Sequence, residues 1–170
     1  DEMCESLYGS FGFIDARDLR MPASKSYAQR AILCAALAEG ESVLRHYSPC
    51  GDSEAALGLA RQIGAEVAVD EDGTVRIKGV AAGTPSSRLA FPDEIFVGES
   101  GLLTRLVLPL VAQLAGKPVI INGEKTLAKR SLDGVPQIME AFGARVESLS
   151  GGDCVTVPLR VSGPLANGRI

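Results

Sequence analysis

The chain of 170 residues has one histidine, four cysteines and no tryptophan. Cys4, Cys34, Cys50 and Cys154 lie far apart and form no Cys-x-x-Cys motif. Zinc sites and the disulfide frameworks of small secreted domains depend on characteristic spacings of Cys and His residues. The sequence therefore indicates neither kind of site, and we expect reduced, partly buried thiols.

Aromatic residues make up 5% of the chain, and the formal net charge is −4. A nucleic-acid-binding surface normally combines a basic stripe with stacking aromatics, so we expect no nucleic-acid partner. The sequence has no uncharged apolar run of 18 residues, and its first ten residues do not resemble a signal peptide. We therefore expect a soluble, cytoplasmic chain with no membrane partner. Its 46% hydrophobic content suits one globular domain or two small units.

The chain contains an internal repeat with a spacing of 75 to 79 residues. The stretch AALAEGESVLR, which begins at residue 35, matches AQLAGKPVII, which begins at residue 112. QIGAEV at 62–67 matches AFGARV at 141–146. Three pairs of equivalent residues keep nearly the same spacing: Gly40 with Gly116, Gly64 with Gly143, and Arg30 with Arg105. We therefore predict two copies of one structural unit.

Both copies follow the pattern of a βαβαββ unit, which assigns the chain to the α/β (α+β) class. Capping residues, glycines and alternating apolar residues predict the elements of the first unit, residues 21–80. These are a helix at 24–38, a strand at 42–47, a helix at 52–63 with Asp52 as its N-cap, and a hairpin at 65–79 that turns at Asp72 and Gly73.

A turn-rich connector at 81–92 precedes the second unit, residues 93–157. The elements predicted there are a strand at 94–98, a helix at 100–115, a strand at 118–123, a helix at 132–142, and a hairpin at 144–157 that turns at Gly151 and Gly152. Residues 158–170 are expected to begin a third unit, and residues 1–20 form an N-terminal arm.

The predicted helix at 100–115 is apolar on nearly all sides, which is typical of a helix that is buried all round. Pro109 falls in its middle, where we expect a kink or a boundary because a proline removes one helical hydrogen bond. Arg105 lies in the same stretch, and a buried guanidinium needs a partner. We expect that partner to be Glu99, Asp52 or a ligand.

Cations stand at or just before predicted helix starts. The cations are Lys25 and Arg30 in the first helix, Arg105 in the second, and Lys129 and Arg130 before a third. Ser26 stands four residues before Arg30, and Gly101 stands at the equivalent place before Arg105. Free N–H groups at a helix N-terminus attract anions, and a cation there is unfavourable unless an anion lies between them. The pattern predicts an anion site, although solvated surface cations and a glycine that eases packing fit it too.

Four motifs carry a resemblance to the EPSP synthase family: PASKSYAQR, GDSEAAL, FVGESGLLTR and KTLAKRSLDG. The resemblance runs from about Met21 to Ile170. It implies transfer of the enolpyruvyl group of phosphoenolpyruvate to the 5-hydroxyl of shikimate 3-phosphate, with release of phosphate and without a metal or organic cofactor. It also implies two domains of three βαβαββ units each, of the inverse α/β-prism type, with the active site between them.

The resemblance implies a role for seven residues. Lys25 matches a catalytic lysine that touches both substrates, Ser26 and Arg30 match residues that hold shikimate 3-phosphate, Gly101 and Arg130 match residues at phosphoenolpyruvate, and Asp52 and Arg105 match supporting positions. The sequence departs from the usual pattern at Ala23 for Gly, Tyr27-Ala28-Gln29 for Ile-Ser-Asn, Glu99-Ser100 for Asn-Ala, Leu102-Leu103 for Thr-Ala, and Ser131 for Pro. The changes at 99–103 flank the phosphoenolpyruvate contact and leave affinity for that substrate open.

Within the family pattern, the chain stops where a third unit would begin. We therefore expect a fragment that lacks its second domain, cannot turn over alone, and has residues 1–20 associated with that domain. One alternative is the related UDP-N-acetylglucosamine enolpyruvyl transferase, which has Asn where Ser26 stands and a loop cysteine that 110–125 lacks. A second alternative is a non-catalytic module that binds phosphate or another anion.

Overall fold

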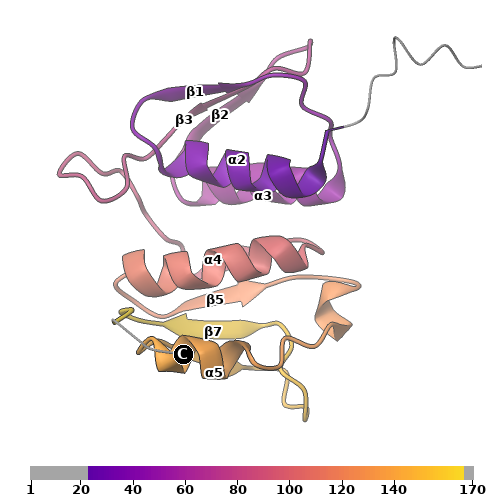
Figure 1. Ribbon diagram of the computed structural model, residues 1–170, viewed down its shortest axis with the longest axis vertical. Helices are drawn as coiled ribbons and strands as arrows, with labels where there is room; N and C mark the ends of the chain where they lie inside the picture. The colour runs from indigo at the N-terminus through magenta and orange to yellow at the C-terminus, as the bar shows by residue number, and fades with distance from the viewer. Residues whose placement is uncertain (1–22, 167–170) are drawn as a thin grey trace, which may run out of the picture.

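Two α/β units follow each other along the chain in the computed structural model, which describes residues 23–166 (Figure 1). The first unit contains α2 (Lys25–Leu37), β1 (Glu41–Leu44), α3 (Gly51–Gln62), β2 (Glu66–Val69) and β3 (Val75–Lys78). The second contains β4 (Glu94–Phe96), α4 (Gly101–Leu114), β5 (Val119–Asn122), the 3-10 helix η2 (Leu127–Lys129), α5 (Val135–Ala141), β6 (Arg145–Ser148) and β7 (Leu159–Ser162). The expected arm at 1–20 lies outside the described residues.

The two sheets share one strand order. The first sheet is β1-β3-β2 and the second is β4-β5-β7-β6, so the last strand of each unit lies between two earlier ones. All pairs are antiparallel except β4 with β5, which is parallel. The common order of β1-β3-β2 and β5-β7-β6 agrees with the repeat that the sequence predicts.

Local signals placed several elements correctly. Ser24 caps α2 by accepting a hydrogen bond from Tyr27 N, and Gly40, with φ +83°, follows the helix end. The first hairpin turns at Gly73, whose φ is +77°, while Asp72 accepts a hydrogen bond from Thr74 N. These positions confirm the helix at 24–38 and the hairpin at 65–79.

Two helix starts differ from the prediction. Helix α3 begins at Gly51 with Cys50 as N-cap, not at Asp52, because Ser53 Oγ accepts a hydrogen bond from Cys50 N at 3.0 Å. Helix α5 begins at Val135 rather than 132, since its N-cap Gly134 has φ +85°, which a helix cannot include. The corrected start of α3 leaves the Asp52 carboxylate free for another contact.

The second hairpin was placed too early. Strand β6 pairs with β7, from Arg145 opposite Ser162 to Ser148 opposite Leu159, so residues 149–158 form the connecting loop. Leu159 and Val161 are fully buried, which draws this later stretch into the sheet. Residues 159–162, which we expected in a third unit, therefore belong to the sheet of the second.

Helix α4 lacks the boundary that was one of the two outcomes expected at Pro109, and it is exposed on one side. It runs through Pro109 and ends only at Leu114, so no boundary forms at the proline. Val107, Leu108 and Val111 are buried on either side of Pro109, and this packing keeps the stretch helical despite the lost hydrogen bond. The helix is also not buried all round, because Arg105 and Gln113 are exposed.

The helices α2 and α3 lie side by side on the first sheet, and α4 lies between them and the second sheet (Figure 1). The side-chain amide of Gln62 joins the two units at the free edge of β4. Its Oε1 accepts from Phe96 N at 3.1 Å, and its Nε2 donates to Phe96 O at 3.3 Å. Through residues 23–166, no helix combines the length and hydrophobicity that a membrane span requires.

Candidate functional site

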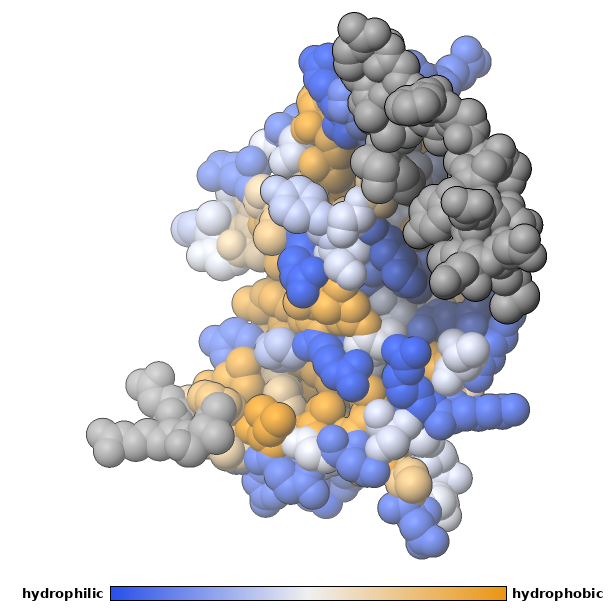
Figure 2. Space-filling model, turned by 45° about the vertical axis from the view of Figure 1, so that its right-hand side comes forward, coloured by the Kyte–Doolittle hydropathy of each residue, from blue (hydrophilic) through white to orange (hydrophobic). Residues whose placement is uncertain are grey.

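Three helix N-termini meet at one cleft between the two units. The cleft has a volume of about 460 Å3. It is lined by Lys25, Ser26, Gln29, Cys50, Gly51, Asp52, Glu99, Ser100, Gly101, Leu102, Thr126 and Arg130. On the face drawn in Figure 2, hydrophilic residues gather where the two units meet, next to an apolar band at the level of α4. Helices α2, α3 and α4 thus bring their free N–H groups and positive dipole ends to one place.

Each of these helices starts at the cleft because of a local cap. Ser24 caps α2, and Ser100 caps α4 by accepting a hydrogen bond from Leu103 N at 3.0 Å. Cys50 and Ser53 form a capping box at α3. The first turns of α2 and α4 contain no acidic residue, so nothing within those helices neutralises the positive ends.

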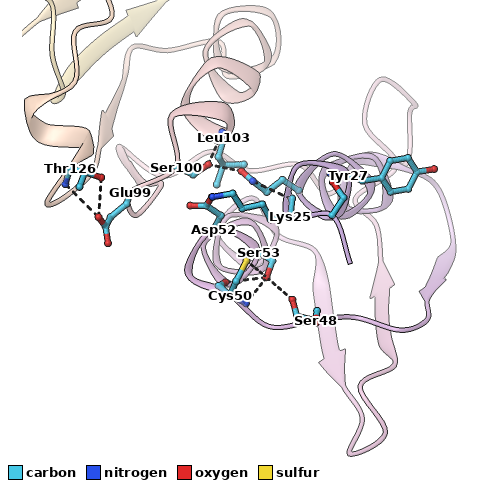
Figure 3. A network of polar contacts seen from close by, with 12 residues as sticks. Lys25, Tyr27, Ser48, Cys50, Asp52, Ser53, Glu99, Ser100, Leu103 and Thr126 are labelled. Atoms are coloured by element: carbon cyan, nitrogen blue, oxygen red, sulfur yellow. Dashed lines mark hydrogen bonds and ion pairs between the residues drawn. The ribbon is translucent and has the colours of Figure 1, made fainter. Parts of the chain in front are cut away.

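Lys25 is paired with a carboxylate across the cleft. Its Nζ lies 3.1 Å from Asp52 Oδ2, which comes from the first turn of α3 (Figure 3). The Lys25 side chain is 67% exposed and the Asp52 side chain 21%. The chain therefore supplies a counter-ion for the lysine itself, while the exposed ammonium keeps room for a second anion.

Arg30 and Arg105 make the same contact on equivalent helices. Arg30 Nη1 donates to Ser26 O and Arg105 Nη1 donates to Gly101 O, both at 2.9 Å. This matching geometry agrees with the repeat. Both arginines are exposed and neither lines the cleft.

Neither of the two carboxylates expected as partners of Arg105 contacts it. In the part of the chain that the structure describes, Arg105 makes no ion pair with Glu99 or Asp52, because its exposed guanidinium bends back to the backbone. It lines a separate apolar groove between α4 and α5, together with Leu108 and Phe142.

Arg130 lies against the N-terminus of α4, although it precedes α5 in the sequence. A Cβ atom added to Gly101 would lie 2.7 Å from Arg130 Nη1, so the guanidinium rests against the first residue of α4. Only a residue without a side chain allows this approach. The predicted pair of Gly101 and Arg130 is therefore brought together in space, although the residues are far apart in the sequence.

Glu99 ties the segment that carries Arg130 to the start of α4. Its Oε2 accepts from Thr126 Oγ1 at 3.0 Å (Figure 3). Its Oε1 lies 3.2 Å from Lys125 Nζ. The hydrogen bond from Thr126 is the main cause that lowers the pKa of Glu99, followed by that from Lys125. Glu99 therefore acts as a charged anchor at the rim of the cleft.

Sequence reasoning missed several cleft residues. The thiol of Cys50 lies 3.3 Å from Ser53 Oγ, and this hydrogen bond lowers the pKa of Cys50. Gln29 and Ser100 are both buried beneath the cleft. The signal for Gln29 was present, because it stands three residues before Ile32 on the apolar stripe of α2, where a polar residue is unusual.

The family model described as EPSP synthase (3-phosphoshikimate 1-carboxyvinyltransferase) matches residues 16–170. The 3-phosphoshikimate 1-carboxyvinyltransferase of Bacillus licheniformis is 33% identical over 147 residues, which cover 84% of this chain and 32% of the relative. The protein of the same name from Thermococcus kodakarensis is 34% identical over 153 residues, which cover 90% of this chain and 34% of the relative. The chain thus spans about a third of the length of these relatives.

Among solved structures, the EPSP synthase of Acinetobacter baumannii is similar in fold. The TM-score is 0.74 at 24% sequence identity, and the match covers 86% of this chain and 32% of that one. At this identity the likeness concerns the fold, which agrees with the predicted α/β class.

Proposed function

This chain belongs to the EPSP synthase family, and from that membership we propose that it forms one side of the substrate site of an enolpyruvyl transferase. The reaction joins C2 of phosphoenolpyruvate to the 5-oxygen of shikimate 3-phosphate. The bond between C2 and the phosphate oxygen breaks, phosphate leaves, and the hydroxyl proton is lost. The two substrates and the missing second domain are the partners of this chain in the proposal.

The convergence of three helix N-termini with Lys25 and Arg130 at one cleft is the observation that carries this proposal. Both substrates are anions that repel each other, so bringing them together requires fixed positive potential. Helix ends and cations held in place before binding provide it without reorganisation, and they also stabilise the departing phosphate.

We assign the binding roles in accordance with this electrostatics. Lys25 contacts both substrates. Ser26 in the cleft holds shikimate 3-phosphate together with Arg30, which lies outside the cleft lining and contacts Ser26 O. Arg130 and the backbone of Gly101 bind phosphoenolpyruvate at α4.

Two further residues support these groups. Asp52 holds the ammonium of Lys25 in the cleft through the ion pair at 3.1 Å. Arg105 stabilises the first turn of α4 through its hydrogen bond to Gly101 O. Neither contact requires the supporting residue to touch a substrate.

The complete gene product tests this function. On mixing with phosphoenolpyruvate and shikimate 3-phosphate it is expected to release phosphate, and with plain shikimate in place of the phosphate ester it is expected to release far less. The 170-residue chain alone is expected to release none, because the second domain supplies the rest of the site. Release of phosphate only when UDP-N-acetylglucosamine is the acceptor would favour the related transferase instead.

Arg30→Ala is expected to weaken binding of shikimate 3-phosphate to the complete protein by about tenfold, as for an exposed charge-assisted hydrogen bond of about 1.4 kcal/mol. Its Nη1 donates to Ser26 O at 2.9 Å, and the other N–H groups of the guanidinium can donate to the phosphate. Isothermal titration calorimetry measures the dissociation constant.

Arg105→Ala is the matched control, because it removes the same contact on the equivalent helix α4, which is not proposed to hold shikimate 3-phosphate. Its dissociation constant for shikimate 3-phosphate is expected to stay near the wild-type value. An unchanged constant for Arg30→Ala would remove Arg30 from the site.

A further inference from the structure

We propose that Gln29 and Ser100 are positioning residues that fix the distance between the N-termini of α2 and α4, and so between the two substrates. The inference rests on the proposed function and deepens it. Gln29 stands four residues after Lys25, and Ser100 immediately precedes Gly101. Gln29 is thus about one helical turn from Lys25, and Ser100 is adjacent to Gly101, and both of these neighbours are assigned to bind a substrate.

The two side chains link the helix ends through one continuous set of hydrogen bonds, of which Figure 3 shows the one between Ser100 and Leu103. Gln29 Nε2 donates to Lys25 O at 3.2 Å, and Gln29 Oε1 accepts from Ser100 Oγ at 2.5 Å. Ser100 Oγ in turn accepts from Leu103 N in the first turn of α4. The backbone of α2 at Lys25 is therefore joined to the backbone of α4 by two side chains.

Burial gives this link its strength. Gln29 is 1% exposed and Ser100 is 2% exposed. A shift of one helix end would therefore leave a buried polar group unpaired. In the described part of the chain, every buried side-chain N or O atom has a hydrogen-bond partner. The arrangement of α2 and α4 is consequently held to the one geometry that satisfies both side chains.

Stability alone does not account for a polar pair at this place. The neighbouring stripe of α2 is apolar at Ile32, Leu33 and Ala36, and an apolar pair would fill the same space without a desolvation cost. What the hydrogen bond adds is a fixed distance and orientation. Group transfer between two bound molecules is sensitive to that distance, because small misplacements of the reacting atoms reduce the rate strongly.

The test is a double-mutant cycle in the complete protein with Gln29→Met, Ser100→Ala and the double variant. Gln29→Met leaves the Ser100 hydroxyl without its acceptor, while Ser100→Ala leaves Gln29 Oε1 unpaired and also removes the cap of Leu103 N, so both are expected to lower the melting temperature. The double change removes the mismatch between the two side chains and keeps only the loss of the cap, so its melting temperature is expected to lie above that of Ser100→Ala. The kcat per folded molecule is nevertheless expected to be about tenfold lower in all three variants, because each of them lacks the same bond.

A merely structural role predicts a different result. Activity per folded molecule would then stay within about twofold of wild type in the double variant, and this outcome would overturn the inference. Additive losses of kcat would also overturn it, since they would mean that the two residues act separately. The dissociation constant for shikimate 3-phosphate, which α2 holds in this proposal, is expected to change little in all three.

Two further variants separate the link from the helix cap. Ser100→Thr keeps the hydroxyl and is expected to retain kcat, whereas Ser24→Ala removes the equivalent cap of α2 without breaking the link and is expected to affect stability alone. Wild-type protein that releases no phosphate would overturn the proposed function together with this inference. Active wild-type protein with unaffected variants would overturn the inference alone.

Discussion

Lys25→Ala is expected to lower kcat/KM of the complete protein by about 100-fold or more. One charge-assisted hydrogen bond contributes about 1.5–3 kcal/mol, which corresponds to about 10- to 150-fold in rate. Because Lys25 is proposed to contact both substrates, its loss belongs at the upper end of this range. Steady-state measurement of phosphate release at varied concentrations of each substrate gives the value.

The ion pair with Asp52 adds to this loss. Without the ammonium, the carboxylate that now lies 3.1 Å from Lys25 Nζ stays in the cleft unpaired and repels both anionic substrates. Neutralising it in Lys25→Ala/Asp52→Asn is therefore expected to recover about fivefold, as for about 1 kcal/mol between partly solvated charges.

Lys78→Ala provides the matched control. Lys78 is also an exposed lysine with a carboxylate partner, since its Nζ lies 3.4 Å from Glu66 Oε1, but it stands on β3 and does not line the cleft. Its removal is expected to leave kcat/KM within about twofold of wild type. If Lys25→Ala behaved like Lys78→Ala, Lys25 would have no part in the site.

The parts of the fold that could be predicted depend on local signals. The serine cap of α2 and the Asp72-Gly73 turn act within a few residues, and the sequence shows them directly. Local signals could not identify the strand that pairs with β6. The sequence predicted 153–157, whereas the observed partner is β7 at 159–162, which also pairs with β5 and so completes the sheet. Long-range packing of this kind leaves no short motif.

In the candidate site, too, local signals could be predicted from the sequence and long-range contacts could not. The repeat placed Lys25 and Gly101 at helix starts, and the structure brings both to one cleft. The contact between Ser100 and Gln29 joins residues that are 71 positions apart, and only the folded chain reveals it. For Arg105, composition pointed to burial, but the helix orientation turned that position outward. The assignment of each residue to a substrate remains a prediction that binding and rate measurements test.

Gly101→Ala is expected to lower kcat/KM for phosphoenolpyruvate by about 30-fold while leaving the fold intact. The new methyl group would lie 2.7 Å from Arg130 Nη1 and 3.2 Å from Arg105 Nη1. Both atoms end flexible side chains that can move, and alanine favours the helix, so the melting temperature is expected to stay near that of wild type. The displaced Arg130 guanidinium loses a charge-assisted contact of about 2 kcal/mol to the substrate, which sets the size of the effect.

A double-mutant cycle with Arg130→Ala shows whether the methyl group acts through that arginine. If it does, Gly101→Ala causes little further loss once Arg130 is absent, because the group that it displaces is already gone. Binding of shikimate 3-phosphate, which α2 holds, is expected to be unchanged in all variants. Fully additive losses would show that the methyl group blocks the substrate by itself, and an unchanged kcat/KM for phosphoenolpyruvate in Arg130→Ala would take Arg130 out of the site. Because the predicted clash involves two movable side chains and no backbone atom, a large loss of stability in Gly101→Ala would contradict the geometry at the start of α4.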